Sequence, residues 1–423
     1  RGIMGRIVIL GGYGAFGAHA AGRLARDPAT EIVVAGRSLA KARAQVAKLI
    51  AGGARAVLEP AELDAMRATG ERLRALGADI VINASGPFQT QDYSLARAAI
   101  AAGCHYIDLA DARAFVTGIA AVDDAAREAG VAIVAGASSV PALSGAVARH
   151  LADGLDAVRT VEISISASNR ATSGRSVAAA ILSYVGRPIR LRRCRRWTRG
   201  WGWQELRRET FVIEGEPALK GRWLALADVP DHDLMPDMLP GRPAVTFHAG
   251  TDIALQTLGL WLLSWPVRWL RVAWLARLTF VVPPLQRLTR FLGSDRSAMS
   301  VALIGVVDGR GIERQWTLIA DDGDGPEIPT LAAVLLAEAV LAGAIPPGAR
   351  DAGRLLDLEQ FEPLFASLSV RHRSVETRLP PPLYERVMGA HYAALPEAVR
   401  EMHRIHGDGG ASGEAIVERG RNI

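Results

Sequence analysis

The chain has 423 residues, of which 49% are hydrophobic and 22% are charged; this balance is typical of a globular protein and excludes a disordered chain. Its two cysteines cannot build a disulfide framework, which favours a reducing, cytoplasmic compartment. The formal net charge is +5, and the chain contains only three lysines, Lys41, Lys48 and Lys220. No secretory signal pattern is visible, and we interpret Met4 as the natural start.

Strand-like and helix-like segments alternate through the first 136 residues. A bare aliphatic run, as at 7–10, is typical of a parallel strand that helices cover on both faces. The alternation predicts a doubly wound parallel sheet, and therefore an α/β protein with an N-terminal Rossmann domain over residues 4–136. Strands are expected at 7–10, 32–35, 56–58, 80–84, 106–109 and 131–135, and helices at 18–26, 39–49, 94–102 and 116–129.

After Pro141 the pattern changes to that of a second, α+β domain, which we expect over residues 137–376. Alternation of apolar and polar residues over 161–166 predicts a strand with one solvated face. Residues 299–307 and 313–320 flank Asp308-Gly309-Arg310-Gly311, a sequence that favours a hairpin turn. Residues 377–423 differ in character, and we interpret them as a partial C-terminal domain or tail with helices at 383–391 and 396–406.

A glycine-rich turn follows the first predicted strand and precedes the first predicted helix. In a G-x-G-x-x-G motif the first glycine permits a tight turn, the second lets the backbone approach a pyrophosphate, and the third allows close helix–strand packing. The helix N-terminus then offers free N–H groups to the phosphates. The motif predicts dinucleotide binding, with a purely structural turn as the alternative, and its residues are Gly12, Gly14, Ala15, Phe16 and Gly17.

The end of the second predicted strand indicates which dinucleotide binds. Most NAD and FAD sites place an acid about 20 residues beyond the glycines, where it holds the ribose hydroxyls. Here the strand ends in Arg37 and Ser38, which can pair with the 2′-phosphate and donate a hydrogen bond to it. We therefore expect NADP(H) as the cofactor. The alternative is that Arg37 is a solvated surface arginine.

A third segment of the expected cofactor site follows the fourth predicted strand. A loop at the carboxyl end of a central strand lies over the nicotinamide ribose in doubly wound folds. Gly86 would allow close backbone approach, and Phe88 could pack on the nicotinamide ring. The alternative is a strand-ending turn with a core phenylalanine. The residues assigned to this segment are Ser85, Gly86, Pro87 and Phe88.

The turn at 11–17 with 35–37, the loop at 85–88 and the segment 103–109 together resemble the saccharopine dehydrogenase-like family of NADP-binding oxidoreductases. The resemblance covers residues 4–150 well and continues loosely to about residue 375. It implies a Rossmann domain followed by an α+β domain that shapes the substrate pocket, but no particular substrate. Residues 395–420 resemble the opening of an uncharacterised domain that is fused to some such reductases.

Hydride transfer requires a protein group that supplies or accepts one proton. Asp111 lies just past the fifth predicted strand, where doubly wound enzymes gather their site residues, and we expect it to be catalytic. The alternative is that Asp111 caps the following helix. Asp108 fits a role in binding backbone amides equally well, His105 is interpreted as a packing or loop residue, and Ser138 and Ser139 fit either substrate contacts or a polar loop. No metal site is expected, since His403 and His406 lack a third ligand nearby.

Residues 253–292 form a Trp/Arg-rich apolar segment. Its longest uncharged run, 253–267, is shorter than the roughly 20 residues that span a bilayer. Ser264 and Pro266 predict a helix start within it. Tryptophan with arginine over 258–292 favours a buried protein interface, such as that of a homodimer, and the alternative is peripheral membrane contact or a lipid-lined pocket. An arginine cluster at 187–199 favours a solvated edge or a lipid-facing patch over nucleic acid.

These patterns predict an NADP(H)-dependent oxidoreductase that transfers hydride to or from a C=O, C=N or activated C=C bond of a small-molecule substrate. The apolar second domain favours a bulky apolar substrate. The alternative is an NADP(H)-binding scaffold or redox sensor that contacts a membrane peripherally and has no turnover.

Overall fold

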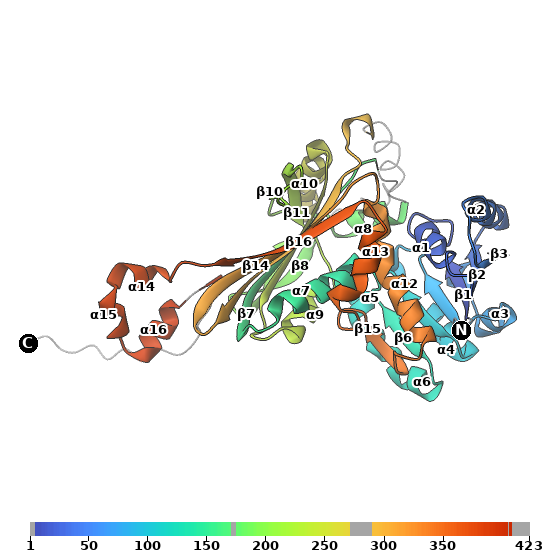
Figure 1. Cartoon of the computed structure of the whole chain (residues 1–423), viewed down its shortest axis with the longest axis horizontal. Coiled ribbons are helices and arrows are strands. Elements are labelled where there is room, and N and C mark those ends of the chain that lie inside the picture. The colour runs from blue at the N-terminus through green and yellow to red at the C-terminus, as the bar shows by residue number, and fades with distance from the viewer. Residues whose placement is uncertain (1–4, 171–174, 271–289, 405, 408–423) are drawn as a thin grey trace, which may run out of the picture.

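The computed structural model describes residues 5–170, 175–270, 290–404 and 406–407, which contain two seven-stranded sheets (Figure 1). The sheets are not separated by solvent, because one apolar core runs from the first sheet into the second. Ile7 and Ile9 of the first sheet belong to the same buried cluster as Val161 and Val301 of the second. The two sheets therefore form one continuous body.

All strand pairs of the first sheet are parallel, which confirms the predicted doubly wound sheet. The strand order is β15-β6-β5-β4-β1-β2-β3, so the chain reverses direction across the sheet between β1 and β4. In such sheets ligands bind beyond the carboxyl ends of the strands at this reversal. The strands are β1 (Gly5–Leu10), β2 (Thr30–Gly36), β3 (Val57–Glu62), β4 (Ile80–Asn83), β5 (His105–Asp108), β6 (Ala132–Ala135) and β15 (Gly348–Asp351).

Helices cover both faces of this sheet, which explains why its strands read as unbroken aliphatic runs. Successive residues of a strand point to opposite faces, and Ile7 and Ile9 of β1 pack in one cluster whereas Val8 and Leu10 pack in the other. The first face is covered by α1 (Gly17–Leu24), α2 (Leu39–Ala51) and α12 (Ile328–Leu341). The second is covered by α3 (Gly70–Ala75), α4 (Ser94–Ala102), α5 (Arg113–Thr117) and α6 (Asp123–Glu128).

The predicted boundary at residue 136 omits two elements of the first domain. Both α12 and β15 come from the range expected for the second domain, yet β15 pairs with β6 and α12 packs on α1. The Ala349 N–H donates to the Asp123 carboxylate at 2.7 Å, and Arg23 of α1 pairs with Glu327 at 2.6 Å. The Rossmann domain is thus built from two separate stretches of chain.

The second sheet has the order β10-β11-β12-β7-β13-β14-β16, and in it only β7 and β12 are parallel neighbours. The predicted hairpin is confirmed, and its turn is the pair Asp308 and Gly309, both with positive φ. The strands are β7 (Ala157–Ala167), β10 (Arg207–Phe211), β11 (Leu219–Leu226), β12 (Ala244–Thr251), β13 (Ser297–Val307), β14 (Arg310–Ala320) and β16 (Val370–Arg378).

The prediction that β7 has a solvated face is wrong at two positions, since Ser164 and Ser166 are buried. This face is covered because β10 folds back over the sheet. The Ser300 hydroxyl of β13 donates to Glu209 of β10 at 2.7 Å, and Phe211 packs against Ala298. The opposite face is covered by α7 (Ser144–Ala152) and α9 (Asp231–Met238).

The arginine cluster at 187–199 forms a two-stranded ribbon of β8 (Pro188–Arg193) and β9 (Arg196–Trp201). Arg190 lies over the Trp197 ring at 4.3 Å, and Arg193 pairs with Glu205 at 2.5 Å. Most of the cluster is exposed. The ribbon precedes β10 and follows α8 (Arg175–Tyr184).

The Trp/Arg-rich segment begins with helix α10 (Ala254–Leu270), and the predicted helix start at Ser264 and Pro266 is wrong. Pro266 lies inside the helix, and Ser264 is buried with its hydroxyl donating to the Trp261 carbonyl at 2.6 Å. Residues 271–289 of the segment, including Trp274, lie outside the described residues. Within the described part of the chain, no helix combines the length and apolarity needed to cross a membrane.

The predicted C-terminal unit forms short helices at the end of the molecule farthest from the first sheet (Figure 1). Gly389 has a φ of 54° and separates two of them, so the helix expected at 383–391 is interrupted. The remaining helices are α13 (Glu362–Ala366), α14 (Leu383–Met388), α15 (Ala390–Ala393) and α16 (Glu397–His403). Residues 408–423 of this unit lie outside the described residues.

Candidate coenzyme and substrate site

The glycine-rich turn between β1 and α1 is too tight for side chains. Gly11 has a φ of 77°, which favours glycine. A Cβ at Gly17 would lie 2.2 Å from the Gly11 carbonyl oxygen, and one at Gly14 would lie 3.0 Å from the same atom. A Cβ at Gly12 would lie 2.9 Å from the Ile9 carbonyl oxygen. These glycines bring the start of α1 against the end of β1.

The same turn leaves backbone donors available at the start of α1. The N–H groups of Gly11 and Gly12 both donate to the Ala35 carbonyl, which fixes the turn to β2. The N–H groups of Ala15 and Phe16 have no hydrogen-bond partner among the described residues, and no side chain caps α1. Unpaired N–H groups at a helix start attract anions. The turn therefore fits the pyrophosphate of a dinucleotide.

Arg37 and Ser38 lie next to this turn, at the carboxyl end of β2. Arg37 is exposed and forms no ion pair within the part of the chain that the structure describes. The Ser38 hydroxyl accepts from the Lys41 N–H at 3.4 Å and so caps α2, while the Ser38 N–H donates to the Tyr13 hydroxyl at 3.0 Å. The guanidinium of Arg37 is thus available to a phosphate.

Tyr13 is a residue of this region that our sequence reasoning missed. Its ring lies against Gly36, where a Cβ would approach the ring to 2.5 Å. The only sequence signal is the glycine at the end of β2, which makes room for the ring. Tyr13 joins the glycine turn to the β2 end that carries Arg37.

The loop after β4 is held by a network of side-chain amides. The Asn83 side-chain oxygen Oδ1 accepts from the Ser85 N–H at 3.0 Å, and the Asn83 side-chain nitrogen Nδ2 donates to the Tyr106 hydroxyl at 3.1 Å. The Gln91 amide donates to the Ser85 carbonyl at 2.8 Å, and the Gly86–Pro87 peptide is cis. Ser85 to Pro87 are therefore fixed at the carboxyl edge of the sheet, next to the glycine turn across β1 and β4.

Phe88 lies inside this loop but faces the core. Its side chain is 6% exposed, and its ring centroid lies 5.5 Å from that of Phe115. This position favours the alternative that Phe88 is a core residue over a contact with the nicotinamide ring. Phe88 therefore anchors the loop to the buried cluster that contains Phe115.

Asp108 ends β5 and is completely buried. Its carboxylate accepts from the Ala110 N–H at 3.0 Å and from the Gly136 N–H at 2.8 Å, which ties the β5 and β6 loops together. Burial raises the pKa of Asp108 to about 7 despite these hydrogen bonds. Asp108 thus has the backbone-binding role that we considered for it.

Asp111 follows three residues later, and it does not cap the next helix. The residue before α5 is Ala112, and no side chain caps α5. The Asp111 carboxylate instead accepts from the Gln89 amide at 3.2 Å. Asp111 is exposed, and the protein around its carboxyl raises its pKa by desolvation. No structural role in the described residues explains the position of Asp111.

Tyr184, at the end of α8, lies near enough to Asp111 to be affected by its charge, and α8 packs near the short helix that contains Gln89. Burial raises the pKa of Tyr184, and the negative charges of Asp111 and Asp228 raise it further. The phenol therefore stays protonated at neutral pH. Sequence reasoning missed Tyr184, because nothing in the local pattern of α8 shows that it packs near the loop after β4.

Arg113 fixes the second domain against the first next to this group. Its guanidinium pairs with Asp233 at 2.6 Å and Asp228 at 3.0 Å, and it donates to the Arg190 carbonyl at 2.8 Å. The Arg113 side chain is 9% exposed, so these contacts are shielded from water. They hold α9 and β8 at the carboxyl edge of the first sheet.

Of the remaining expected residues, His105 has a structural role and the two serines are partly enclosed. The His105 ring accepts from the Ala132 N–H at 2.9 Å and so joins β5 to β6. Ser139 is 9% exposed and Ser138 is half-buried, both in the turn before α7.

A second buried carboxyl lies where α7 meets α9. The Asp231 carboxylate accepts from the Ser144 hydroxyl at 2.5 Å, and Asp231 is fully buried. Burial raises the pKa of Asp231 to about 7. The folded protein thus keeps a proton on Asp231 at pH values where the unfolded chain has lost it.

This difference predicts how stability depends on pH. A raised folded-state pKa contributes stability at acidic pH that is lost as the pH rises through 7. Asp231→Asn removes the effect, so from about pH 4 to 7 the variant should gain about 1.4 kcal/mol of unfolding free energy per pH unit relative to wild type, and no more above pH 7. Urea unfolding across this range measures the gain. If the unfolding free energies of variant and wild type change in parallel with pH, the raised pKa of Asp231 is contradicted. Asp153→Asn, at an exposed aspartate, is the control.

Comparison with known families identifies the first domain. Residues 7–134 match the family model described as the saccharopine dehydrogenase NADP binding domain. This segment is similar to the coenzyme-binding domain of that family. The first domain is therefore an NADP-binding domain, as the resemblance implied. The match also supports the assignment of the protein as an oxidoreductase. The match ends before α12 and β15, which complete the sheet.

None of the curated proteins matches the chain. Solved structures that align with the chain include GenD2 from gentamicin A biosynthesis in complex with NAD, which is 13% identical with a TM-score of 0.40 over 88% of this chain and 96% of that chain. A metagenomic short-chain oxidoreductase in complex with NADP is 19% identical with a TM-score of 0.24 over 31% of this chain and 80% of that one. LigD from Sphingobium sp. strain SYK-6 is 16% identical with a TM-score of 0.24 over 31% of this chain and 76% of that chain.

Proposed function

We propose that the protein is an NADP(H)-dependent oxidoreductase that transfers hydride to or from a C=O, C=N or activated C=C bond. The observation that carries this proposal is the group formed by Asp111, Gln89 and Tyr184. Gln89 and Asp111 follow the paired strands β4 and β5, and Tyr184 lies close enough to Asp111 for the carboxylate charge to raise the pKa of its phenol. Ligands of doubly wound sheets bind beyond the carboxyl ends of the strands.

Each residue of the proposed site has a distinct task. When bound, the nicotinamide supplies the hydride chemistry. The N–H groups of Ala15 and Phe16 bind the pyrophosphate, and Arg37 binds the 2′-phosphate. Asp111 orients the substrate or exchanges the proton that accompanies hydride transfer, and the protonated phenol of Tyr184 donates a hydrogen bond beside it.

The surroundings of Tyr184 support a bulky apolar substrate. The cluster behind Tyr184 consists of Leu182, Val185, Trp203, Ala225 and Val267, with partly buried leucines around it. An apolar wall beside a few polar groups is the usual composition of a small-molecule site. We therefore expect activity with large ketones, imines or enones rather than with amino acids.

Asp111→Asn tests the assignment of the proton-handling group. We expect kcat to fall by about two to four orders of magnitude, because an amide cannot exchange the proton, whereas the Kd for NADPH changes less than about two-fold. NADPH oxidation with a panel of carbonyl, imine and enone compounds provides the activity. Asp153→Asn removes one negative charge elsewhere and should leave kcat unchanged. Full activity of Asp111→Asn would exclude Asp111 and direct attention to Tyr184→Phe.

The alternative is an NADP(H)-binding scaffold without turnover. Both functions predict that NADPH fluorescence changes on binding. Only the enzyme predicts that some member of the panel consumes NADPH. If wild-type protein binds NADPH but consumes it with no member, the scaffold is favoured.

A further inference from the structure

The exposed side of α10 consists only of apolar residues. Leu255, Leu262 and Trp269 are 70%, 65% and 71% exposed and recur every seven residues, so they lie along one side of the helix. The opposite side is buried at Thr257, Ser264 and Val267. The complete set of exposed positions in α10 is Ala254, Leu255, Gly259, Leu262, Pro266, Trp269 and Leu270.

Two further apolar side chains extend this surface. Phe291 and Leu292 are 74% and 61% exposed. Leu292 also lines a surface pocket together with Asp252, which precedes α10 by two residues. Exposed apolar surfaces of this extent mark sites that meet a protein or a membrane. We call α10 with Phe291 and Leu292 the apolar face.

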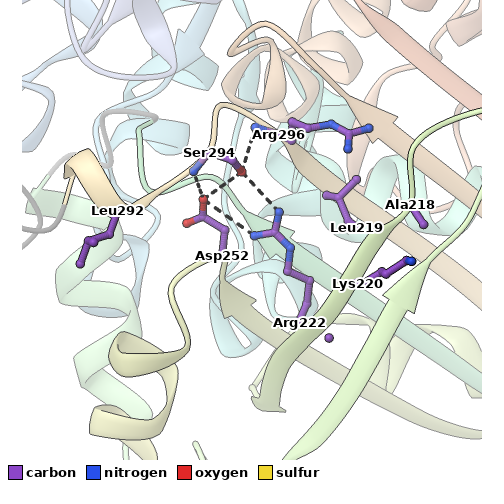
Figure 2. Close-up of a pocket in the computed structure, with 9 residues that line it drawn as sticks. Ala218, Leu219, Lys220, Arg222, Asp252, Leu292, Ser294 and Arg296 are labelled. Atoms are coloured by element: carbon purple, nitrogen blue, oxygen red, sulfur yellow. Dashed lines mark hydrogen bonds and ion pairs between the residues drawn. The ribbon is translucent and has the colours of Figure 1, made fainter.

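The pocket beside the apolar face has a volume of about 340 Å³ and carries three cationic side chains, Lys220, Arg222 and Arg296 (Figure 2). Asp252 lies at its base, 2% exposed, where it accepts from the Ser294 N–H at 2.5 Å. Arg222 donates to the Ser294 hydroxyl at 3.3 Å. Basic residues thus line the pocket, and Leu292 belongs both to the pocket lining and to the apolar face.

The positive charges of this pocket are only partly neutralised. Arg296 pairs with Asp321, but Lys220 forms no ion pair with any described residue. The Arg222 guanidinium is 3.8 Å from Asp252, and burial together with the charge of Arg296 lowers the pKa of Arg222. The cations therefore repel one another, and an anion in the pocket would relieve that repulsion.

We propose that the apolar face and this pocket together form a docking site for an anionic membrane surface. α10 would lie in the plane of the bilayer with its exposed residues among the acyl chains, and a lipid phosphate would bind Lys220 and Arg222. This docking site uses the exposed side of α10, whereas the buried side of α10 packs in the cluster beside Tyr184. It does not depend on the proposed reaction.

Charge and composition favour a bilayer over a second copy of the chain. A twofold interface through the apolar face would bring two cationic pockets into one contact region, and the exposed side of α10 offers no acid to pair with them. A bilayer presents hydrocarbon and phosphate side by side. The flanking side chains also suit an interface, since Trp261, Trp265 and Trp269 contact one another in series and Arg268 lies 5.7 Å from the Trp265 ring.

Flotation of the full chain with vesicles tests the apolar face. With phosphatidylcholine vesicles that contain phosphatidylglycerol, wild type should float, and the double variant Leu262→Glu/Trp269→Glu should bind at least about ten-fold more weakly. Val387→Glu changes an equally exposed apolar residue in α14 and should float like wild type. Circular dichroism and NADPH binding show that each variant is folded. Absence of wild-type flotation would overturn the proposal.

The lysine variants test the phosphate part of the site. Lys220→Gln should weaken binding to the anionic vesicles about five-fold and leave binding to pure phosphatidylcholine unchanged. Lys48→Gln, on α2, is the matched control. Equal effects of the two variants would overturn the pocket assignment. Binding of inorganic phosphate at Lys220 without vesicle binding would identify a free anion as the occupant. A dimer that Leu262→Glu dissociates, without flotation of the wild type, would identify a second copy of the chain. Either result would overturn the proposal of a membrane-docking site.

Discussion

Arg37→Glu should weaken NADPH binding by at least about 100-fold, because the change removes charge-assisted hydrogen bonds to the 2′-phosphate and replaces them with repulsion. NADH has no 2′-phosphate, so its Kd should stay within about three-fold of the wild-type value. Titration calorimetry with both coenzymes measures the two affinities. Arg37 is exposed and unpaired among the described residues, so the substitution should not unfold the protein.

The matched control is Arg55→Glu. Arg55 is also exposed, but it precedes β3 and therefore lies at the opposite edge of the sheet. Its substitution changes the net charge by the same amount and should leave both affinities unchanged. Equal loss of NADPH binding in both variants would indicate a general effect of charge and would contradict the role of Arg37.

Gly17→Ala should abolish measurable binding of both coenzymes and lower the free energy of unfolding by about 2–3 kcal/mol. The new Cβ would lie 2.2 Å from the Gly11 carbonyl oxygen, so the turn must open and displace the N–H groups of Ala15 and Phe16. Calorimetry and urea unfolding measure the two effects.

Gly22→Ala on the same helix is the control for this substitution. A Cβ there would contact only Leu49 Cδ2, at 3.6 Å, which is an ordinary van der Waals distance. Because alanine favours helix over glycine by about 1 kcal/mol, Gly22→Ala should leave coenzyme binding intact and stabilise the protein slightly. Retained coenzyme binding in Gly17→Ala would show that the turn tolerates a side chain and that the phosphate site lies elsewhere.

The features that could be predicted from sequence are those set by short stretches of chain. Short apolar runs predicted the strands of the first sheet that lie within residues 4–136, though not β15, and the glycine spacing predicted the turn between β1 and α1. The hairpin at Asp308 and Gly309 was predictable for the same reason, since both residues adopt positive φ. Each of these features depends on the conformational preferences of a few neighbouring residues.

The features that could not be predicted depend on distant contacts. Ser164 and Ser166 read as solvated, because nothing in β7 indicates that β10 folds over it. Pro266 reads as a helix start, but it occupies an exposed position of α10 where a missing N–H is tolerated. Tyr184 joins the candidate site only through the packing of α8 on the loop after β4.

For Asp111 the sequence left two interpretations open, and local geometry separates them. A helix cap would require the Asp111 side chain to bind the first turn of α5, and it binds Gln89 instead. The catalytic assignment of Asp111 stays a prediction. No other structural role of Asp111 among the described residues explains its position.

The two-segment construction of the first domain has a consequence for biosynthesis. On the ribosome, β6 emerges long before β15, because nearly all of the second sheet is translated between them. Until then β6 has an open edge, and the nascent sheet lacks the apolar cover of α12. An isolated coenzyme-binding fragment would keep both defects, so we expect it to aggregate and the nascent chain to need chaperones until β15 has docked.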